Sequence, residues 1–288
     1  MTPNWASPDN TAHLFNADCL AALPALPEAC ADIVVVDPPY GINVNANGDL
    51  ISRREQALGE RPHNPDTDPR PIANDGPSEA STLFWELLPE CNRILKPGGV
   101  VACCAPGGGP SVIFARWILA LADVFDFKQM VVWDKGPIGM GWHYRRSYEL
   151  VLVAVKRGAR CQWNDTSGTV ENILRPGAYG ICKILPSAEQ HPTEKPERLF
   201  SLFVKLHTQP GQLVVDPCCG RGASGAAAVK LGRRYIGMEI DDDHYARATT
   251  RLAEAFESQA LFAAATQTED GATTNATLFE QNQTPGMA

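Results

Sequence analysis

Short apolar runs alternate with helical patterns along most of this chain, and this alternation limits the possible folds more than any other feature. Strands are predicted where β-branched and aliphatic residues form uninterrupted runs, as in strands buried on both faces. These runs cover residues 33–36, 100–104, 130–133, 150–153, 213–215 and 235–240. Apolar residues at helical spacing predict helices at 83–95, 113–121, 194–206, 223–231 and from 241 onward. The order predicts an α/β fold, with a mostly parallel twisted sheet and helices on both faces.

Proline and glycine set several of the predicted helix boundaries. Pro97, Gly98 and Gly99 are expected to end the helix that precedes them. Pro89 falls inside that helix and should kink it. Pro196 suits the first turn of the helix predicted at 194–206, where its missing N–H costs nothing.

The composition is that of a globular protein, since 44% of the 288 residues are apolar. Two stretches lack the alternation. Residues 41–80 are rich in Asn, Asp, Arg, Pro and Gly, and a loop of this length in a compact domain is usually functional or disordered. Residues 266–288 hold little that could be buried, so we expect a disordered tail after a single domain at 1–265.

The sequence carries no pattern typical of a membrane span, a secretory signal or a metal site. No apolar run approaches the about 20 residues that cross a bilayer, and the first ten residues lack the basic and apolar regions of a signal peptide. The nine cysteines have no C-x-x-C spacing, which argues against a zinc ribbon or a disulfide scaffold. We therefore expect a cytoplasmic protein with reduced thiols and no bound metal.

The net charge of −8 at first argues against a nucleic-acid partner, but its distribution changes this interpretation. Five acids and no base follow from Glu254 onward, which leaves 25 − 28 = −3 for the rest. Between Lys128 and Arg160, seven bases stand against two acids. This basic stripe is equally consistent with phosphate contacts and with a solvated face whose counter-charges lie elsewhere.

A glycine turn follows the predicted strand at 213–215. Gly220 and Gly222 would let the backbone approach a ligand, and the helix that follows would present free N–H groups. No Gly-Lys-Ser/Thr follows, so this is not a P-loop. Asp216 at the turn would repel a pyrophosphate and suit an ammonium or sulfonium group, while Glu239 ends the next strand, where a ribose diol is expected. The alternative is a tight turn with a surface carboxylate.

A second polar turn, Asp37-Pro38-Pro39-Tyr40, follows the buried run at 33–36. Ligand sites of α/β proteins lie at the carboxyl ends of strands. The two prolines stiffen the backbone, so the Asp37 carboxylate and the Pro38 carbonyl would act as paired acceptors beside the flat ring of Tyr40. An extruded nucleobase offers the matching planar amine. The alternative is a proline-stiffened loop without a ligand.

Together these motifs resemble DNA amino-methyltransferases, the S-adenosylmethionine-dependent enzymes that modify adenine N6 or cytosine N4. The pattern is most similar to the circularly permuted (β) class of phages, prophages and restriction-modification systems, where the catalytic motif precedes the cofactor motif. The resemblance extends in order from about residue 14 to residue 252. Its segments are Asn16-Ala17-Asp18, Asp37 to Tyr40, Pro71 to Asp75, Trp133 to Gly136, Gly139 to Gly141, Tyr148-Glu149, His191 to Pro196, Asp216 to Gly222, and Glu239.

The resemblance implies a Rossmann-like methyltransferase fold that moves a methyl group to the exocyclic amine of a flipped base. Adenine N6 is favoured, because Asp rather than Ser stands at position 37; cytosine N4 is the first alternative. The implied catalytic residues are Asp37, Pro38, Pro39 and Tyr40. The implied cofactor contacts are Asp18 at the adenine, Glu239 at the ribose, His191, Thr193 and Lys195 at the methionine end, and Asp37, Asp216, Pro217, Gly220 and Gly222.

The implied substrate is double-stranded DNA. Candidate phosphate contacts are Arg145, Arg146, Arg157 and Arg160. The insert at 41–80 is expected near the target base. Residues 158–190 are expected to form a short target-recognition region, because only about 33 residues separate Arg157 from His191. The resemblance leaves a homodimer and a restriction endonuclease partner open.

Two departures from the family pattern keep other functions open. Cys218 stands where members usually have Phe, and Arg221-Gly222-Ala223 where they have Ser-Gly-Thr or similar. These changes motivate the alternative of an inactive cofactor- and DNA-binding protein. A protein-glutamine or RNA methyltransferase is a further alternative, against which the motif order argues. Cys218 is not expected to act as the nucleophile of a cytosine-C5 enzyme, because it would lie in the cofactor turn.

Overall fold

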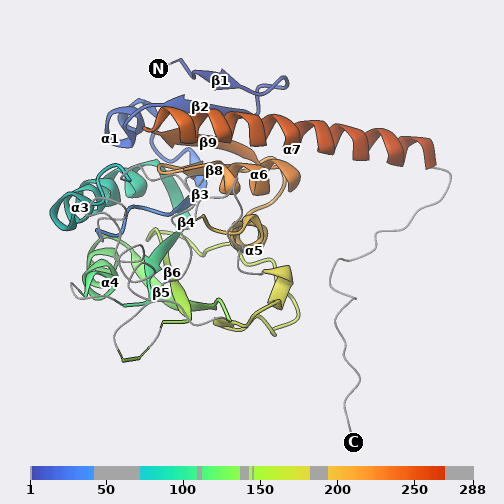
Figure 1. Cartoon of the computed structure of the whole chain (residues 1–288). Coiled ribbons are helices and arrows are strands. Elements are labelled where there is room, and N and C mark those ends of the chain that lie inside the picture. Colours follow the sequence, from blue (N-terminus) through green and yellow to red (C-terminus); the bar gives the residue numbers. More distant parts are fainter. Residues whose placement is uncertain are drawn as a thin grey trace, which may run out of the picture.

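The computed structural model describes residues 2–41, 72–108, 112–136, 143–144, 146–181 and 194–269, with side chains up to residue 259 except that of Pro77 (Figure 1). The strands in these ranges are β1 (Trp5–Ala6), β2 (Ala12–Asn16), β3 (Ala31–Val36), β4 (Leu95–Pro106), β5 (Asp126–Asp134), β6 (Tyr148–Val155), β7 (Ile173–Leu174), β8 (Leu213–Asp216) and β9 (Arg234–Glu239). The helices are α1 (Cys19–Ala22), α3 (Pro77–Ile94), α4 (Ile113–Val124), α5 (Glu197–His207), α6 (Ala223–Lys230) and α7 (Asp242–Glu269). Two short 3-10 helices are η1 (Leu23–Ala25) and η2 (Ala178–Gly180).

The strands of the described ranges form one sheet in the order β1-β2-β9-β8-β3-β4-β6-β5-β7. The five strands from β2 to β4 in this order are parallel neighbours, whereas β6 runs antiparallel between β4 and β5. The short β1 adds an antiparallel edge. Every predicted apolar run lies on a strand, except that Ile240 lies just past β9. The predicted α/β fold with a mostly parallel sheet is therefore confirmed.

The sheet is covered on both faces, as the uninterrupted apolar runs predict. In β3, Val34 and Val36 face one layer, where they join Phe84 of α3 and Trp117 of α4 in a buried cluster. Ile33 and Val35 belong to the opposite cluster, which α5, α6 and α7 cover with residues such as Phe203, Ala227 and Leu252. Figure 1 shows α3 and α4 on one side of the sheet and α5, α6 and α7 on the other.

Several boundaries differ from the predicted ones. The helix before Pro97 already ends at Ile94, and Pro97, Gly98 and Gly99 belong to β4. The pairing of β3 with β4 shifts there, from Ala31 opposite Leu95 to Ile33 opposite Val100, so these residues form an irregularity in the ladder rather than a stop.

The helices also begin and end at other residues than predicted. α3 begins at Pro77 instead of residue 83 and continues past Pro89, and Pro196 is the N-cap of α5 rather than a residue of its first turn. α7 extends to Glu269, four residues into the stretch predicted as a disordered tail, and the remaining tail lies outside the described residues. Within the described part of the chain, no helix combines the length and apolar character needed to cross a membrane.

The connections leave a crevice at the carboxyl ends of β3 and β8, which pair with each other in the centre of the sheet. From β3 the chain crosses through α3 to β4 on one side, while from β8 it crosses through α6 to β9 on the other side. Crossovers that diverge in this way expose the strand ends between them, and α/β proteins bind ligands there. The two polar turns singled out in the sequence follow these two strands.

Candidate active site

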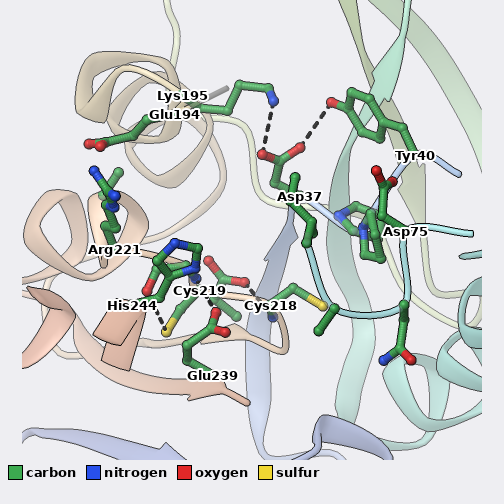
Figure 2. A pocket seen from close by; sticks show the side chains of 18 of the residues that line it. Asp37, Tyr40, Asp75, Glu194, Lys195, Cys218, Cys219, Arg221, Glu239 and His244 are labelled. Atoms are coloured by element: carbon green, nitrogen blue, oxygen red, sulfur yellow. Dashed lines mark hydrogen bonds and ion pairs between the residues drawn. The ribbon is translucent and has the colours of Figure 1, made fainter. Parts of the chain in front are cut away.

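A pocket of about 370 Å³ opens at the carboxyl ends of β3 and β8. The turn after β3 supplies Asp37 and Tyr40, the end of β8 and its turn supply Asp216 and Gly220, and Glu239 comes from the end of β9. Figure 2 shows Asp37 between Lys195 and Tyr40. The two motifs, far apart in the sequence, therefore line one pocket.

Two side chains hold the carboxylate of Asp37. The Tyr40 hydroxyl donates to Oδ1 at 2.9 Å, and Nζ of Lys195 donates to Oδ2 at 2.9 Å (Figure 2). Burial raises the pKa of Asp37, and the ammonium of Lys195 opposes this rise. The side chain remains 25% exposed. An ionised carboxylate has about four lone-pair positions, so Asp37 can still accept a hydrogen bond from a ligand.

The turn around Asp37 is fixed by its own sequence and by one distant residue. Pro38 and Pro39 restrict the backbone after the buried strand. Gly41 has a φ of +70° and donates its N–H to Oδ1 of Asp75 at 2.8 Å. The sequence alone predicts no role for Asp75 beyond its place in a family segment, because its partner is a backbone amide. The structure shows that it holds the backbone just after the turn at residues 37–40.

Three further charges continue from Asp37 along the pocket wall. Nζ of Lys195 lies 3.2 Å from Oε2 of Glu149, and Nζ of Lys135 donates to Oε1 of Glu149 at 2.5 Å. Burial opposes the charge on Lys195, but Asp37 and Glu149 outweigh it and raise the pKa of Lys195 above its usual value. Burial likewise opposes the charge on Glu149, and the two lysines outweigh it and lower its pKa. Lys195 was expected at a cofactor's methionine end; here its ammonium binds two carboxylates.

The glycine turn after β8 has the backbone that its sequence predicts. Gly220 and Gly222 have φ values of +52° and +78°, in the region that favours glycine. Oε2 of Glu239 accepts the N–H of Gly220 at 2.8 Å, and Oε1 accepts the N–H of Asp241 at 2.9 Å. Burial raises the pKa of Glu239. Glu239 therefore lines the pocket and ties the turn to the end of β9.

Asp216 is a buried carboxylate in the pocket wall, with 1% of its surface exposed. It accepts the N–H of Cys218 at 3.0 Å and the hydroxyl of Ser224, which also shares a hydrogen bond with Tyr235. Burial raises the pKa of Asp216 to about 7. Asp216 is therefore not a surface carboxylate.

The position where family members usually have Phe belongs to a pair of thiols. Cys218 shares a hydrogen bond with Cys19, and this bond together with burial raises the pKa of Cys218 well above its usual value. Both side chains line the pocket beside Asp18, which caps α1 by accepting the N–H of Leu20 at 2.9 Å. Two small side chains thus line the wall next to the predicted adenine contact.

Some predicted site residues lie elsewhere. Pro217 and Gly222 are buried beneath the turn, and a Cβ on Gly222 would lie 3.0 Å from Leu252 and from the Cα of Ala248, so this glycine allows α7 to pack closely. His191 and Thr193 lie outside the described residues, as do Arg145, residues 42–71 of the insert and residues 182–190 of the predicted recognition region.

The sheet separates the candidate phosphate contacts. Arg146 precedes β6 and lines the pocket, where it donates to the carbonyl of Gly108 at 3.1 Å. Arg157 and Arg160 follow β6, whose antiparallel direction brings its end beside the start of β4, at the edge of the sheet opposite the pocket. The guanidinium of Arg157 donates to carbonyl oxygens at the end of α4, including that of Phe125 at 2.6 Å. We therefore carry only Arg146 forward as a candidate contact.

The two parts of the pocket suit different chemical groups. Asp18 and Glu239 place carboxylates in one part, beside the buried Asp216, so this part accepts hydrogen bonds from hydroxyl and amino groups and attracts a cation. The other part offers the Asp37 carboxylate beside the ring of Tyr40. The pocket thus fits a cationic, hydroxyl-bearing ligand next to a planar group with an amine.

Comparisons with known proteins agree with this geometry. The chain is 25% identical over 266 residues to the DNA adenine methyltransferase YhdJ of Escherichia coli, an alignment that covers 83% of this chain and 82% of the relative. It is 26% identical to the type II methyltransferase M.HinfI of Haemophilus influenzae, over 84% of this chain and 68% of the relative.

Solved structures share the fold. The complex of M1.HpyAVI with SAM has a TM-score of 0.57 at 22% identity and covers 84% of this chain and 100% of that chain. PvuII DNA methyltransferase, described as cytosine-N4-specific, has a TM-score of 0.63 at 16% identity and covers 88% and 93%. The profile of the N6/N4 family, described as DNA methylase, matches residues 31–250. This match spans both turns and most of the sheet, and the chain therefore belongs to the DNA methylase family.

Proposed function

We propose that this DNA methylase transfers a methyl group from S-adenosylmethionine to N6 of adenine in DNA. The observation that carries the proposal is the position of Asp37 and Tyr40 in the same pocket as the acidic turn of β8. S-adenosylmethionine supplies a methyl group on a positively charged sulfur. The carboxylates of the acidic part fit this charge and the ribose hydroxyls, which supports its use as the donor.

The residues proposed to hold the cofactor follow from this fit. Glu239 would accept the ribose hydroxyls, Asp18 would contact the adenine, and Asp216 would hold the glycine turn through the N–H of Cys218. The family resemblance further proposes His191, Thr193 and Lys195 for the methionine end. Calorimetric titration of the protein with S-adenosylmethionine tests this part without any turnover.

The catalytic turn would act on a base flipped out of the duplex. Flipping costs a few kcal/mol, which stacking on Tyr40 partly offsets. Asp37 and the Pro38 carbonyl would accept hydrogen bonds from the amino group and draw its lone pair out of conjugation towards the methyl group. Catalysis would then rest on alignment and on fixed acceptors. Asp37 supports this role because Tyr40 and Lys195 fix both of its oxygens.

Adenine is proposed over cytosine on two grounds. Asp stands at position 37, and a relative that covers most of this chain is named a DNA adenine methyltransferase. The cytosine-N4-specific neighbour keeps the second base as the alternative. The same proposal includes a homodimer, a restriction endonuclease partner and a cytoplasmic location. Sedimentation of the purified protein tests the homodimer.

Nucleoside mass spectrometry is the direct test. The protein is incubated with S-adenosylmethionine and unmethylated mixed-sequence DNA, beside an Asp37→Ala variant and a surface control, Asp126→Ala. N6-methyladenine from the wild type and the control alone supports the proposal. N4-methylcytosine changes the base and keeps the mechanism. Cofactor binding without any methylated base would overturn the proposal and favour the inactive binding protein.

A further inference from the structure

Two family segments have no role in the mechanism so far. Lys135 follows β5 and Glu149 lies at the start of β6, and both line the pocket. The antiparallel register pairs Trp133 with Glu149, and the N–H of Lys135 donates to the carbonyl of Ser147 at 2.7 Å. The hairpin-like pairing of these strands therefore brings the lysine and the glutamate together at the edge where β3 also ends.

The side chains form a row of alternating charges. It begins at Asp37, continues through Lys195 and Glu149 at 2.9 and 3.2 Å, and ends at Lys135 at 2.5 Å. Lys195 is the most buried of the four, with 5% of its side chain exposed, against 20% for Glu149 and 23% for Lys135. The ammonium of Lys195 also lies 4.9 Å from the ring centre of Tyr40.

Stability alone does not account for a buried row of this kind. The cost of taking charges out of water often exceeds their mutual attraction, so apolar residues of similar size would serve a core equally well. Charges that shift one another's titration at a pocket are instead typical of functional sites. Here one end of the row is the carboxylate that would accept the target amine.

We propose that Lys195 and Glu149 are positioning residues that set the orientation and acceptor strength of the Asp37 carboxylate. Lys195 holds Oδ2, while the Tyr40 hydroxyl holds Oδ1, so the carboxylate is fixed against rotation. Glu149 forms an ion pair with the same ammonium, so the positive charge of Lys195 does not fully neutralise Asp37. Lys135 in turn holds Glu149 at the pocket wall. This inference rests on the proposed methyl transfer to a base amine.

The two residues act on Asp37 in opposite directions. Lys195 lowers the pKa of Asp37 and Glu149 raises it, against a background of burial that raises it. Other titratable groups around Asp37 are Tyr40, Asp216, Cys103 and Cys104. Removing the cation must therefore raise the pKa of Asp37, and removing the Glu149 charge must lower it.

The test measures Asp37 itself. The full-length protein is labelled with carboxyl-13C aspartate, and the Asp37 signal is identified by its loss in Asp37→Asn. We expect the titration midpoint to move up in Lys195→Met, by about 1 pH unit or more as for an opposite charge within about 4–6 Å, and to move down in Glu149→Gln. Glu149→Gln is nearly isosteric, and its amide oxygen can still accept a hydrogen bond from one of the two lysines.

Matched controls come from ion pairs away from the pocket. Lys96→Met removes the partner of Asp32 at the start of β3, and Glu90→Gln removes the partner of Arg93 on α3, at an exposure of 26% close to that of Glu149. Both controls should leave the Asp37 titration unchanged. Shifts of the same sign in both test variants, or no shift in either, would overturn the inference.

The pH dependence of kcat provides a second test of the positioning role. The kcat of Lys195→Met should fall at neutral pH and recover partly at higher pH, where Asp37 ionises, while the acid limb of Glu149→Gln should move to lower pH with a reduced plateau. The KM for S-adenosylmethionine should change little in Glu149→Gln. If the wild type transfers no methyl group, the proposed function fails, yet the carboxyl titration still decides the positioning role.

Discussion

The turns after β3 and β8 each carry a carboxylate at the end of a buried strand, but the two carboxylates are held in different ways. Asp216 is 1% exposed and accepts from a backbone N–H and a hydroxyl within the next eight residues. Asp37 is 25% exposed and is held by Tyr40 and by the ammonium of Lys195. Neutral local donors make Asp216 part of the turn's framework, whereas the cation of Lys195, from a distant segment, opposes the rise in the pKa of Asp37 that burial causes.

Asp37→Ala should have the largest effect, because it should abolish the proposed function of the β3 turn and leave that of the β8 turn intact. We expect methyl transfer to fall by at least about 100-fold, because the acceptor of the target amine is lost. Binding of S-adenosylmethionine should stay close to that of the wild type, since the acidic part of the pocket remains intact. Transfer of labelled methyl groups and calorimetry measure the two effects. Activity within a few-fold of the wild type would remove Asp37 from the mechanism.

Gly222→Ala tests the tight packing of the β8 turn. The new Cβ would lie 3.0 Å from Leu252 and from the Cα of Ala248, at a φ of +78°. Strain and overpacking together should lower the free energy of unfolding by about 2–4 kcal/mol. Gly211→Ala is the matched control, because its φ is +82° but no atom lies within 4 Å of its Cβ. Urea unfolding of both variants separates the packing from the backbone strain, and equal losses would contradict the packing argument.

Asp216→Asn tests whether the buried carboxylate of the β8 turn makes the stability of the protein depend on pH. The pKa of Asp216 is raised to about 7, so folding favours its protonated form. This contribution is complete below the pKa of the unfolded chain and is lost as pH rises through about 7, at up to about 1.4 kcal/mol per pH unit. The variant lacks this slope, so it should gain stability relative to the wild type between pH 5 and pH 8. Urea unfolding at both pH values measures the gain; a constant difference would show that Asp216 titrates normally.

The smallest effects are expected from substitutions of two arginines, one at the pocket edge of the sheet and one at the opposite edge. Arg146→Ala should weaken DNA binding and reduce the salt slope by about 1, if its guanidinium contacts a phosphate. Arg157→Ala should leave the slope unchanged and cost about 0.3–1 kcal/mol of stability, because it removes a cation from the carboxyl end of α4. Fluorescence titrations at several salt concentrations measure the slopes. Equal slopes for the two variants would remove the distinction between the edges.

The sequence predicts the centre of the fold well and its edges poorly. The runs in β3, β4, β6 and β8 are buried on both faces and have no other plausible structure. β1, β2 and β7 were not predicted, because they are short or interrupted by polar residues and depend on a neighbouring strand for their pairing. Pro97 to Gly99 enter β4 for the same reason, since the neighbouring strand β3 determines where pairing resumes.

In the candidate site, too, local sequence patterns are predicted and contacts between distant segments are not. The turns at Asp37 and Asp216 are local patterns, so the sequence predicts both and the structure brings them together. The partners of Asp37 come from segments far away, and no spacing rule connects Glu149 with Lys195. The candidate arginines were grouped by charge alone. This grouping ignores the direction of β6, which places Arg146 and Arg157 at opposite edges of the sheet.

The hydrogen bond between Gly41 and Asp75 has a consequence for how this protein tolerates change. It joins the backbone N–H just after Tyr40 to a single carboxylate 34 residues away, at a distance of 2.8 Å. The backbone at the end of the Asp37 turn therefore depends on a side chain that does not belong to the turn. A substitution at Asp75 would disturb this backbone even though the residues of the turn itself are unchanged.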